Sequence, residues 1–133
     1  IPVYEDKEKK YRYIEALPEP GTTCIKKEAF SGCSSLQSVI IPNSVTTIGI
    51  DAFLFCKSLQ LVTIPNSVTT IGDFAFYYCS SLQTVTIPNS VTIINEGEFI
   101  GCDELNQVSI PKHLEERVRE LEVFPKHTKI IVR

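Results

Sequence analysis

The sequence has no excess of positive charge and no long apolar run, and it contains neither methionine nor tryptophan. Its net charge of −3 and pI near 5.4 argue against a nucleic-acid partner, because nucleic-acid binding needs a basic stripe. No apolar stretch approaches the roughly 18–20 residues that cross a bilayer, so no membrane insertion is expected. The first ten residues lack both Met and an apolar signal core. We therefore expect a processed chain or a fragment whose export signal would already be missing.

Signatures of catalysis and of cofactor binding are also lacking. The sequence shows no Ser/His/Asp arrangement, no glycine-rich phosphate loop and no paired carboxylate motif. His113 and His127 have no ligand partner at a fixed spacing and are expected to be surface residues. We predict a protein that is not an enzyme and that uses no cofactor and no metal.

What the sequence does contain is a repeat. Prolines stand at positions 42, 65, 88 and 111, a constant step of 23 residues. The same step separates the members of five further columns: Phe30, Phe53, Phe76 and Phe99; Cys33, Cys56, Cys79 and Cys102; Leu36, Leu59, Leu82 and Leu105; Val39, Val62, Val85 and Val108; and Ile41, Ile64, Ile87 and Ile110. Self-similarity at this period indicates a stacked repeat protein.

Each column has a physical reading as part of one coil. Val39 and Ile41 alternate in an extended segment and therefore face the same core. Pro42 cannot donate to a strand ladder and ends the strand. Val45 and Ile48 then form a second apolar pair on the far wall of the coil. One coil cannot bury its own apolar face, whereas stacked coils share a continuous core.

The pattern Leu-x-x-Val-x-Ile-Pro-x-x-Val-x-x-Ile-Gly-x-x-Ala-Phe-x-x-Cys resembles the 23-residue leucine-rich repeat of the BspA-like family. The resemblance runs from about Leu17 to Ile110. It implies an α/β solenoid, a right-handed leucine-rich repeat superhelix with a parallel β-sheet, built mostly of strand and loop. It also implies a non-catalytic protein-binding module of the cell-surface or secreted adhesin type.

We expect a single leucine-rich repeat domain over residues 1–133. Residues 1–17 would form an N-terminal segment and cap, in which Tyr11–Leu17 has strand character. Residues 18–110 would form the repeats and 111–133 a C-terminal helix-strand cap. Aligning Leu17-Pro18 with Ile41-Pro42 requires one inserted residue, expected near Pro18–Gly21. Terminal repeats are usually degenerate in this way.

The tail is predicted to form an amphipathic helix over Lys112–Phe124, ended by Pro125, and then a strand over Thr128–Arg133. This strand would pair in parallel with Gln107–Ile110 through a right-handed crossover and close the open sheet edge. The apolar residues of the helix recur at i, i+4 and i+7: Leu114, Val118 and Leu121.

The cysteine column predicts a ladder rather than a metal site, because zinc needs ligands that converge on one point. Neighbouring disulfides would have a suitable Cα spacing, but stacked side chains point the same way, which keeps the Cβ atoms too far apart. Buried thiols are the favoured interpretation. Cys24 lies outside the ladder and is expected to be a free thiol.

The fourth repeat departs from the pattern at Glu98, which stands where Ala29, Ala52 and Ala75 stand in the other copies. A carboxylate at this position would be costly if it were buried without a partner.

Residues that flank the inward valines form the first candidate binding surface. In leucine-rich repeat proteins generally, this exposed side of the sheet is the concave ligand surface. An alternative is that these residues are only good strand formers on a solvated sheet. The candidates are Ser38, Ile40, Leu61, Thr63, Thr84, Thr86, Gln107 and Ser109.

A second candidate surface departs from the usual family pattern. Where Ser31-Gly32 and Gly101 show small residues, the middle repeats carry Leu54-Phe55 and Tyr77-Tyr78. These would stack into an apolar and aromatic patch of a kind that often marks contact sites. The alternative is that one residue of each pair folds into the core.

The expected partner is a protein ligand, with a host or extracellular-matrix protein as one possibility and self-association as another. Two alternatives stay open for the function. Unpaired thiols favour an intracellular interaction scaffold in the cytoplasm, because oxidising compartments tend to consume them. A structural or self-assembling spacer is the other alternative.

Overall fold

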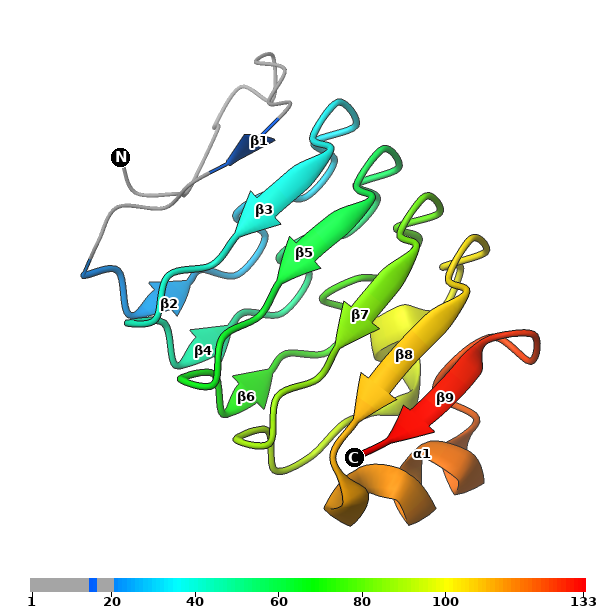
Figure 1. Cartoon of the computed structure of the whole chain (residues 1–133). Coiled ribbons are helices and arrows are strands. Elements are labelled where there is room, and N and C mark those ends of the chain that lie inside the picture. The colour runs from blue at the N-terminus through cyan, green and yellow to red at the C-terminus, as the bar shows by residue number, and fades with distance from the viewer. Residues whose placement is uncertain (1–14, 17–20) are drawn as a thin grey trace.

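A computed structural model describes residues 15–16 and 21–133, and it confirms the predicted solenoid. The segments 1–14 and 17–20, which include most of the predicted N-terminal strand and cap, lie outside the described residues. The main wall is a parallel sheet in the order β1-β3-β5-β7-β8-β9 (Figure 1). Its strands are β1 (Glu15–Ala16), β3 (Ser38–Ile40), β5 (Leu61–Thr63), β7 (Thr84–Thr86), β8 (Gln107–Ile110) and β9 (Lys129–Val132).

The second wall is a smaller parallel sheet of three two-residue strands, β2 (Cys24–Ile25), β4 (Thr47–Ile48) and β6 (Thr70–Ile71). Gly49 and Gly72 follow two of these strands, where consecutive coils come very close together. A Cβ on Gly49 would lie 2.6 Å from the backbone nitrogen of Lys27, and one on Gly72 would lie 2.5 Å from that of Ile50. Glycine is therefore needed at these corners to let neighbouring backbones approach.

The repeat columns form the core between the two walls. All four column valines and all four column leucines are buried. The phenylalanine column is a stack of nearly parallel rings, with centroids 5.2 Å apart from Phe30 to Phe53 and from Phe53 to Phe76, and 5.3 Å apart from Phe76 to Phe99. Faithful repetition thus serves to align identical side chains along one axis.

The column cysteines are buried thiols, as predicted, and Cys24 is an exposed thiol. Three of them also donate a hydrogen bond across the stack, each to a phenylalanine carbonyl 26 residues earlier. The Sγ–O distances are 3.1 Å from Cys56 to Phe30, 3.1 Å from Cys79 to Phe53 and 3.2 Å from Cys102 to Phe76. The thiols therefore fill space and satisfy a backbone acceptor of the preceding coil.

The inserted residue predicted for the first repeat is not found. Glu15 pairs with Ser38 and Cys24 pairs with Thr47, so both sheets keep the 23-residue step across this region. The proline-based alignment was wrong because strand pairing follows the backbone register rather than the proline position.

The C-terminal cap consists of the 3-10 helix η2 (Lys112–Leu114), the helix α1 (Glu115–Leu121) and strand β9. Strand β9 pairs in parallel with β8, as predicted, from Gln107↔Lys129 to Ile110↔Val132. The helix ends earlier than predicted. Glu122 adopts a left-handed conformation with φ 50°, and its N–H donates to the carbonyl of Val118, so termination precedes Pro125.

The cap is joined to the repeats through the core. Leu114 and Val118 are buried, and Leu121 packs partly buried against the same cluster. Phe124 lies with its ring centroid 4.9 Å from that of Phe99, which places it at the end of the phenylalanine stack. The tail thereby covers an apolar end that would otherwise face water.

Candidate functional site

The first predicted surface is the outer sheet face, defined as the outward side chains of the six-stranded sheet. Its predicted members Ile40, Leu61, Thr63, Thr84, Thr86 and Gln107 are exposed, whereas Ser38 and Ser109 are half-buried. Register pairs Leu61 with Ser38, and Ile40 with Thr63, so the two large apolar residues lie diagonally rather than directly opposite. The face is therefore mainly small and polar.

Sequence reasoning did not include the last strand in this face. Lys129 pairs with Gln107, and Ile131 pairs with Ser109, so both continue the outward rows. Ile131 is 36% exposed. The predicted pairing of the tail strand already contained this information, because outward positions follow from the register.

The second predicted surface is more distinctive. Phe55, Phe74, Tyr77 and Tyr78 form an aromatic strip in which each ring contacts at least one other ring. Centroid distances are 5.7 Å for Phe55–Tyr78, 5.4 Å for Phe74–Tyr77 and 4.6 Å for Tyr77–Tyr78. Phe55, Phe74 and Tyr78 are 42%, 43% and 40% exposed. Leu54 and Tyr77 are half-buried, so neither residue pair sends a side chain into the core.

Phe74 was not among the predicted residues. Glu28 and Asp51 occupy the equivalent position in the two preceding repeats. Both are acidic, whereas Phe74 is aromatic, so the three residues share no pattern that would single out Phe74 in the sequence. A signal was nevertheless present, because Phe74 stands three residues before Tyr77 in a segment rich in aromatics.

Three strip residues have an unusual backbone. Phe55, Phe74 and Tyr78 adopt left-handed φ values of 59°, 58° and 57°. Gly32 and Gly101 occupy the column of Phe55 and Tyr78, with φ values of 77° and 80°. Bulky side chains are disfavoured in this conformation, at a cost of order 1–3 kcal/mol each. Glycine would adopt these backbone conformations with less strain than the aromatic residues do.

Glycines of the following coil make room for two of these rings. A Cβ on Gly97 would lie 2.7 Å from Cε1 of Phe74, and a Cβ on Gly101 would lie 2.6 Å from Cγ of Tyr78. The rings therefore rest directly on backbone. Close packing of this kind restricts the rotation of both rings.

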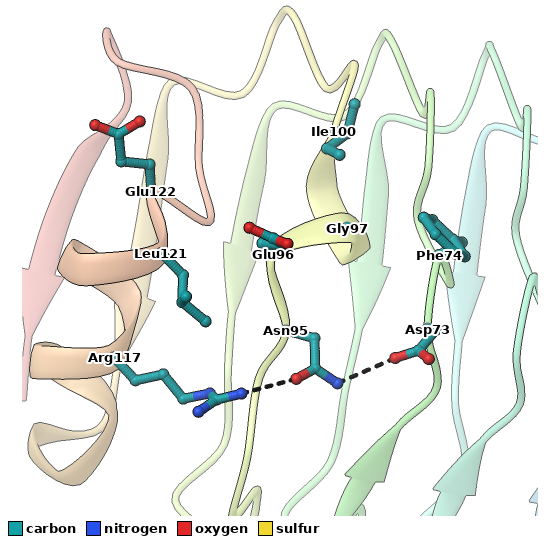
Figure 2. A pocket seen from close by; sticks show the side chains of 9 residues that line it. All are labelled: Asp73, Phe74, Asn95, Glu96, Gly97, Ile100, Arg117, Leu121 and Glu122. Atoms are coloured by element: carbon teal, nitrogen blue, oxygen red, sulfur yellow. Dashed lines mark hydrogen bonds between the residues drawn. The ribbon is translucent and has the colours of Figure 1, made fainter.

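Next to the strip lies a groove of about 630 Å³ between helix α1 and the last two coils (Figure 2). We call it the helix groove. Its floor contains part of the 3-10 helix η1 (Glu96–Phe99). It is lined by Asp73, Phe74, Asn95, Glu96, Gly97, Ile100, Arg117, Leu121 and Glu122.

One end of the helix groove is crossed by a chain of hydrogen bonds, which Figure 2 shows as dashed lines. The Arg117 guanidinium donates to Asn95 Oδ1 at 2.9 Å, and Asn95 Nδ2 donates to Asp73 Oδ1 at 3.0 Å. Nε of Arg117 also donates to the carbonyl of Ile94 at 2.7 Å. These hydrogen bonds hold the guanidinium of Arg117 against the wall of the groove.

Glu98, which stands in the alanine column, is fully buried beside this groove. One oxygen, Oε2, accepts a hydrogen bond from the Asn95 N–H at 3.0 Å, whereas Oε1 has no partner within residues 15–16 and 21–133. Burial raises the pKa of Glu98 to about 8, with a further increase from Asp73 and a partial decrease from the Asn95 bond and Arg117. The side chain is therefore predominantly neutral at pH 7.

Other titratable groups offer little chemistry. Across residues 15–16 and 21–133, no three His, Cys, Asp or Glu side chains gather as a metal-binding group. His113 is exposed as predicted, although its Nε2 lies 2.8 Å from the Val91 carbonyl. Within the part of the chain that the structure describes, no helix has the length and apolar character needed to cross a membrane.

Solved structures support the family resemblance. A leucine rich cell surface protein from Faecalibacterium prausnitzii superposes with a TM-score of 0.80 at 27% identity, covering 93% of this chain and 33% of that protein. A leucine-rich repeat protein from Bacteroides capillosus has a TM-score of 0.66 at 28% identity, with 72% and 75% of the two chains covered. The T. pallidum leucine rich repeat protein has a TM-score of 0.57 at 29% identity, with 73% and 58% covered.

The chain thus spans only a third of the F. prausnitzii protein. A comparison with curated proteins found no match. The profile of the BspA type leucine rich repeat region, by contrast, matches residues 17–125 in six copies. The chain belongs to the BspA type leucine-rich repeat family.

Proposed function

We propose that this chain is a non-catalytic protein-binding module and that the aromatic strip is its contact surface. The observation that carries the proposal is the connected set of four rings, three of them at least 40% exposed and on left-handed backbone. Tyrosine and phenylalanine are enriched in protein interfaces because they supply rigid apolar area. Keeping them at strained positions makes sense if they contact something outside the chain.

The outer sheet face is the alternative contact surface. Ile40 and Leu61, 45% and 50% exposed, are its largest apolar side chains. They lie on adjacent strands, but small hydroxyl residues surround them. An apolar anchor area larger than two diagonal side chains is typical of interfaces that bind tightly.

The cellular setting that we propose is the bacterial surface or the secreted fraction, with a host or extracellular-matrix protein as partner. Support comes from the similar F. prausnitzii structure, which is described as a cell surface protein. The five thiols favour the competing setting, an intracellular interaction scaffold. Locating the full-length protein by fractionation and antibody labelling of intact cells separates these two settings.

The decisive test places glycine at two strip positions, because Gly32 and Gly101 occupy the equivalent position in the neighbouring repeats. Phe55→Gly together with Tyr78→Gly removes two rings and relieves two left-handed residues, so stability should stay within about 1 kcal/mol of wild type. Immobilised wild-type protein is probed with a panel of purified extracellular-matrix proteins by surface plasmon resonance. We expect the double glycine variant to lose at least about tenfold in affinity for any matrix protein captured.

The matched control is Ile40→Ser with Leu61→Ser, which removes two exposed apolar residues from the outer sheet face. Retained binding in this control and lost binding in the glycine variant would assign the contact to the strip. The opposite pattern would assign it to the outer sheet face. Light scattering at high concentration tests the third alternative, since a monomer would contradict self-assembly as the function of the strip.

A further inference from the structure

The aromatic strip does not end at its rings but continues into the helix groove. Phe74 belongs to both, because it contacts Tyr77 within the strip and lines the groove. Ile100, 43% exposed, lines the groove on the following coil. On the far side Leu121 of α1 supplies a third apolar side chain. A partner lying on the strip would therefore reach the apolar side chains of the helix groove at the edge of the strip.

Negative side chains outnumber positive ones in the lining of the helix groove. Its lining contains three carboxylates, Asp73, Glu96 and Glu122, all of them exposed residues. The lining has a single cation, Arg117, whose guanidinium is already bonded to Ile94 and Asn95. Among the described residues, the Asp73 carboxylate is bonded only to the neutral amide of Asn95, through Oδ1. The groove thus offers apolar walls together with uncompensated negative charge.

Figure 2 shows how these groups are placed. In this view Glu96 lies between Leu121 of the helix and Phe74 of the earlier coil. Glu122 stands at the end of α1, on the same side of the groove as Leu121. A carboxylate between two apolar walls suits a side chain with an aliphatic stem and a cationic head.

We propose that the helix groove holds an extended segment of a protein partner that carries a lysine or arginine side chain next to apolar side chains. The apolar side chains contact Phe74, Ile100 and Leu121, and the cationic head pairs with Glu96 and Glu122. This inference rests on protein binding as the function and adds the chemistry of the partner. Charge complementarity selects a basic segment and rejects an acidic one.

Synthetic peptides provide a direct probe. The first is acetyl-Ser-Phe-Arg-Leu-Arg-Phe-Ser-amide, and the second has citrulline in place of both arginines, which removes the charge and keeps the shape. Titration of isotope-labelled protein, followed by amide NMR, reports both affinity and location. We expect the arginine peptide to bind about two- to thirtyfold more tightly, which is the range that two exposed ion pairs supply. Shifts should centre on Gly97, Ile100 and Leu121.

The protein variant Glu96→Gln with Glu122→Gln should lose that preference for arginine. Its matched control is Glu116→Gln with Glu120→Gln, which changes the net charge equally at exposed helix residues outside the groove lining. The control should keep the preference, and added salt should weaken only the arginine peptide. Equal binding of both peptides, or equal loss in the two variants, would overturn the inference.

Two further outcomes are informative. Dimerisation that shifts the groove resonances would assign the groove to a second copy of the chain and overturn the partner assignment. Loss of matrix-protein binding in the Phe55→Gly and Tyr78→Gly variant, without loss in the Glu96 and Glu122 variant, would uphold the strip and reject the groove. The reverse result would reject the strip as contact surface and retain the groove.

Discussion

The ring of Tyr78 rests on the backbone of Gly101, one coil further along the solenoid. A Cβ at position 101 would lie 2.6 Å from Cδ1 and Cγ of this ring, closer than nonbonded carbons tolerate. Gly101 also has a left-handed φ of 80°. The aromatic strip therefore depends on a glycine that lies outside it.

Gly101→Ala should displace the Tyr78 ring and also strain the backbone at residue 101. We expect a loss of about 1–3 kcal/mol in unfolding free energy, together with a changed near-ultraviolet circular dichroism signal from tyrosine. Gly21→Ala is the matched control, because Gly21 has φ 91° and, apart from its chain neighbours, none of the described residues lies within 4 Å of its Cβ position. The difference between the two variants isolates the ring contact. Equal losses would contradict direct packing of Tyr78 on Gly101.

The buried Glu98 carboxyl should make stability depend on pH. Its folded-state pKa of about 8 exceeds the reference value of 4.5, so the folded chain holds a proton that the unfolded chain releases. Stability contributed by this proton is fully present below pH 4.5 and is lost as pH rises through 8. The loss should reach at most about 5 kcal/mol.

Glu98→Gln removes the ionisation and keeps an oxygen for the Asn95 N–H. Its unfolding free energy should match wild type below pH 4.5, exceed it increasingly as the pH rises, and show the full difference above pH 8. Urea unfolding at a series of pH values measures this difference. Glu96→Gln, at an exposed residue of the same helical turn, is the matched control for the change of charge. An unchanged profile in Glu98→Gln would show that another group controls the titration.

Thiol chemistry should separate Cys24 from the column. Burial raises the pKa of the Cys102 thiol to about 12 and also raises that of Cys79, so neither forms the reactive thiolate near neutral pH. Ellman's reagent should label one thiol per folded chain, Cys24, and five after unfolding. Cys24→Ser should abolish the rapid labelling of the folded chain by this reagent. Rapid labelling of two or more thiols in the folded protein would contradict the buried ladder.

The valine column should matter for stability alone. Val62 is 4% exposed, and Val62→Ala should cost about 1–3 kcal/mol through lost burial and a residual cavity. Thr63→Ala changes the next residue of the same strand, which faces outward, and should change stability by less than about 0.5 kcal/mol. Urea unfolding measures both variants. A costly Thr63→Ala would mean that the outer sheet face stabilises the fold instead of remaining available for a partner.

Much of the fold follows from the sequence by itself. A constant 23-residue step aligns identical side chains in space, so inward columns such as Val39 and Val62 could be assigned without coordinates. The tail strand was predictable for a related reason, because an open parallel edge favours one more strand. The early end of α1 was not predictable, since Glu122 takes a left-handed conformation that glycine usually occupies.

Tertiary structure decided which outward residues gather into a candidate site. Phe74 has no aromatic counterpart in its column, yet left-handed backbone and ring packing place it between Tyr77 and Gly97. Arg117 and Leu121 reach the groove only because the cap folds back beside coil residues that are 17–48 positions earlier in the chain. Periodicity specifies contacts between equivalent positions, which is why the sequence by itself determined the core. The left-handed conformations recur at the same 23-residue step. The strip and the groove, however, join non-equivalent positions, and contacts between such positions depend on how the coils and the cap pack in three dimensions.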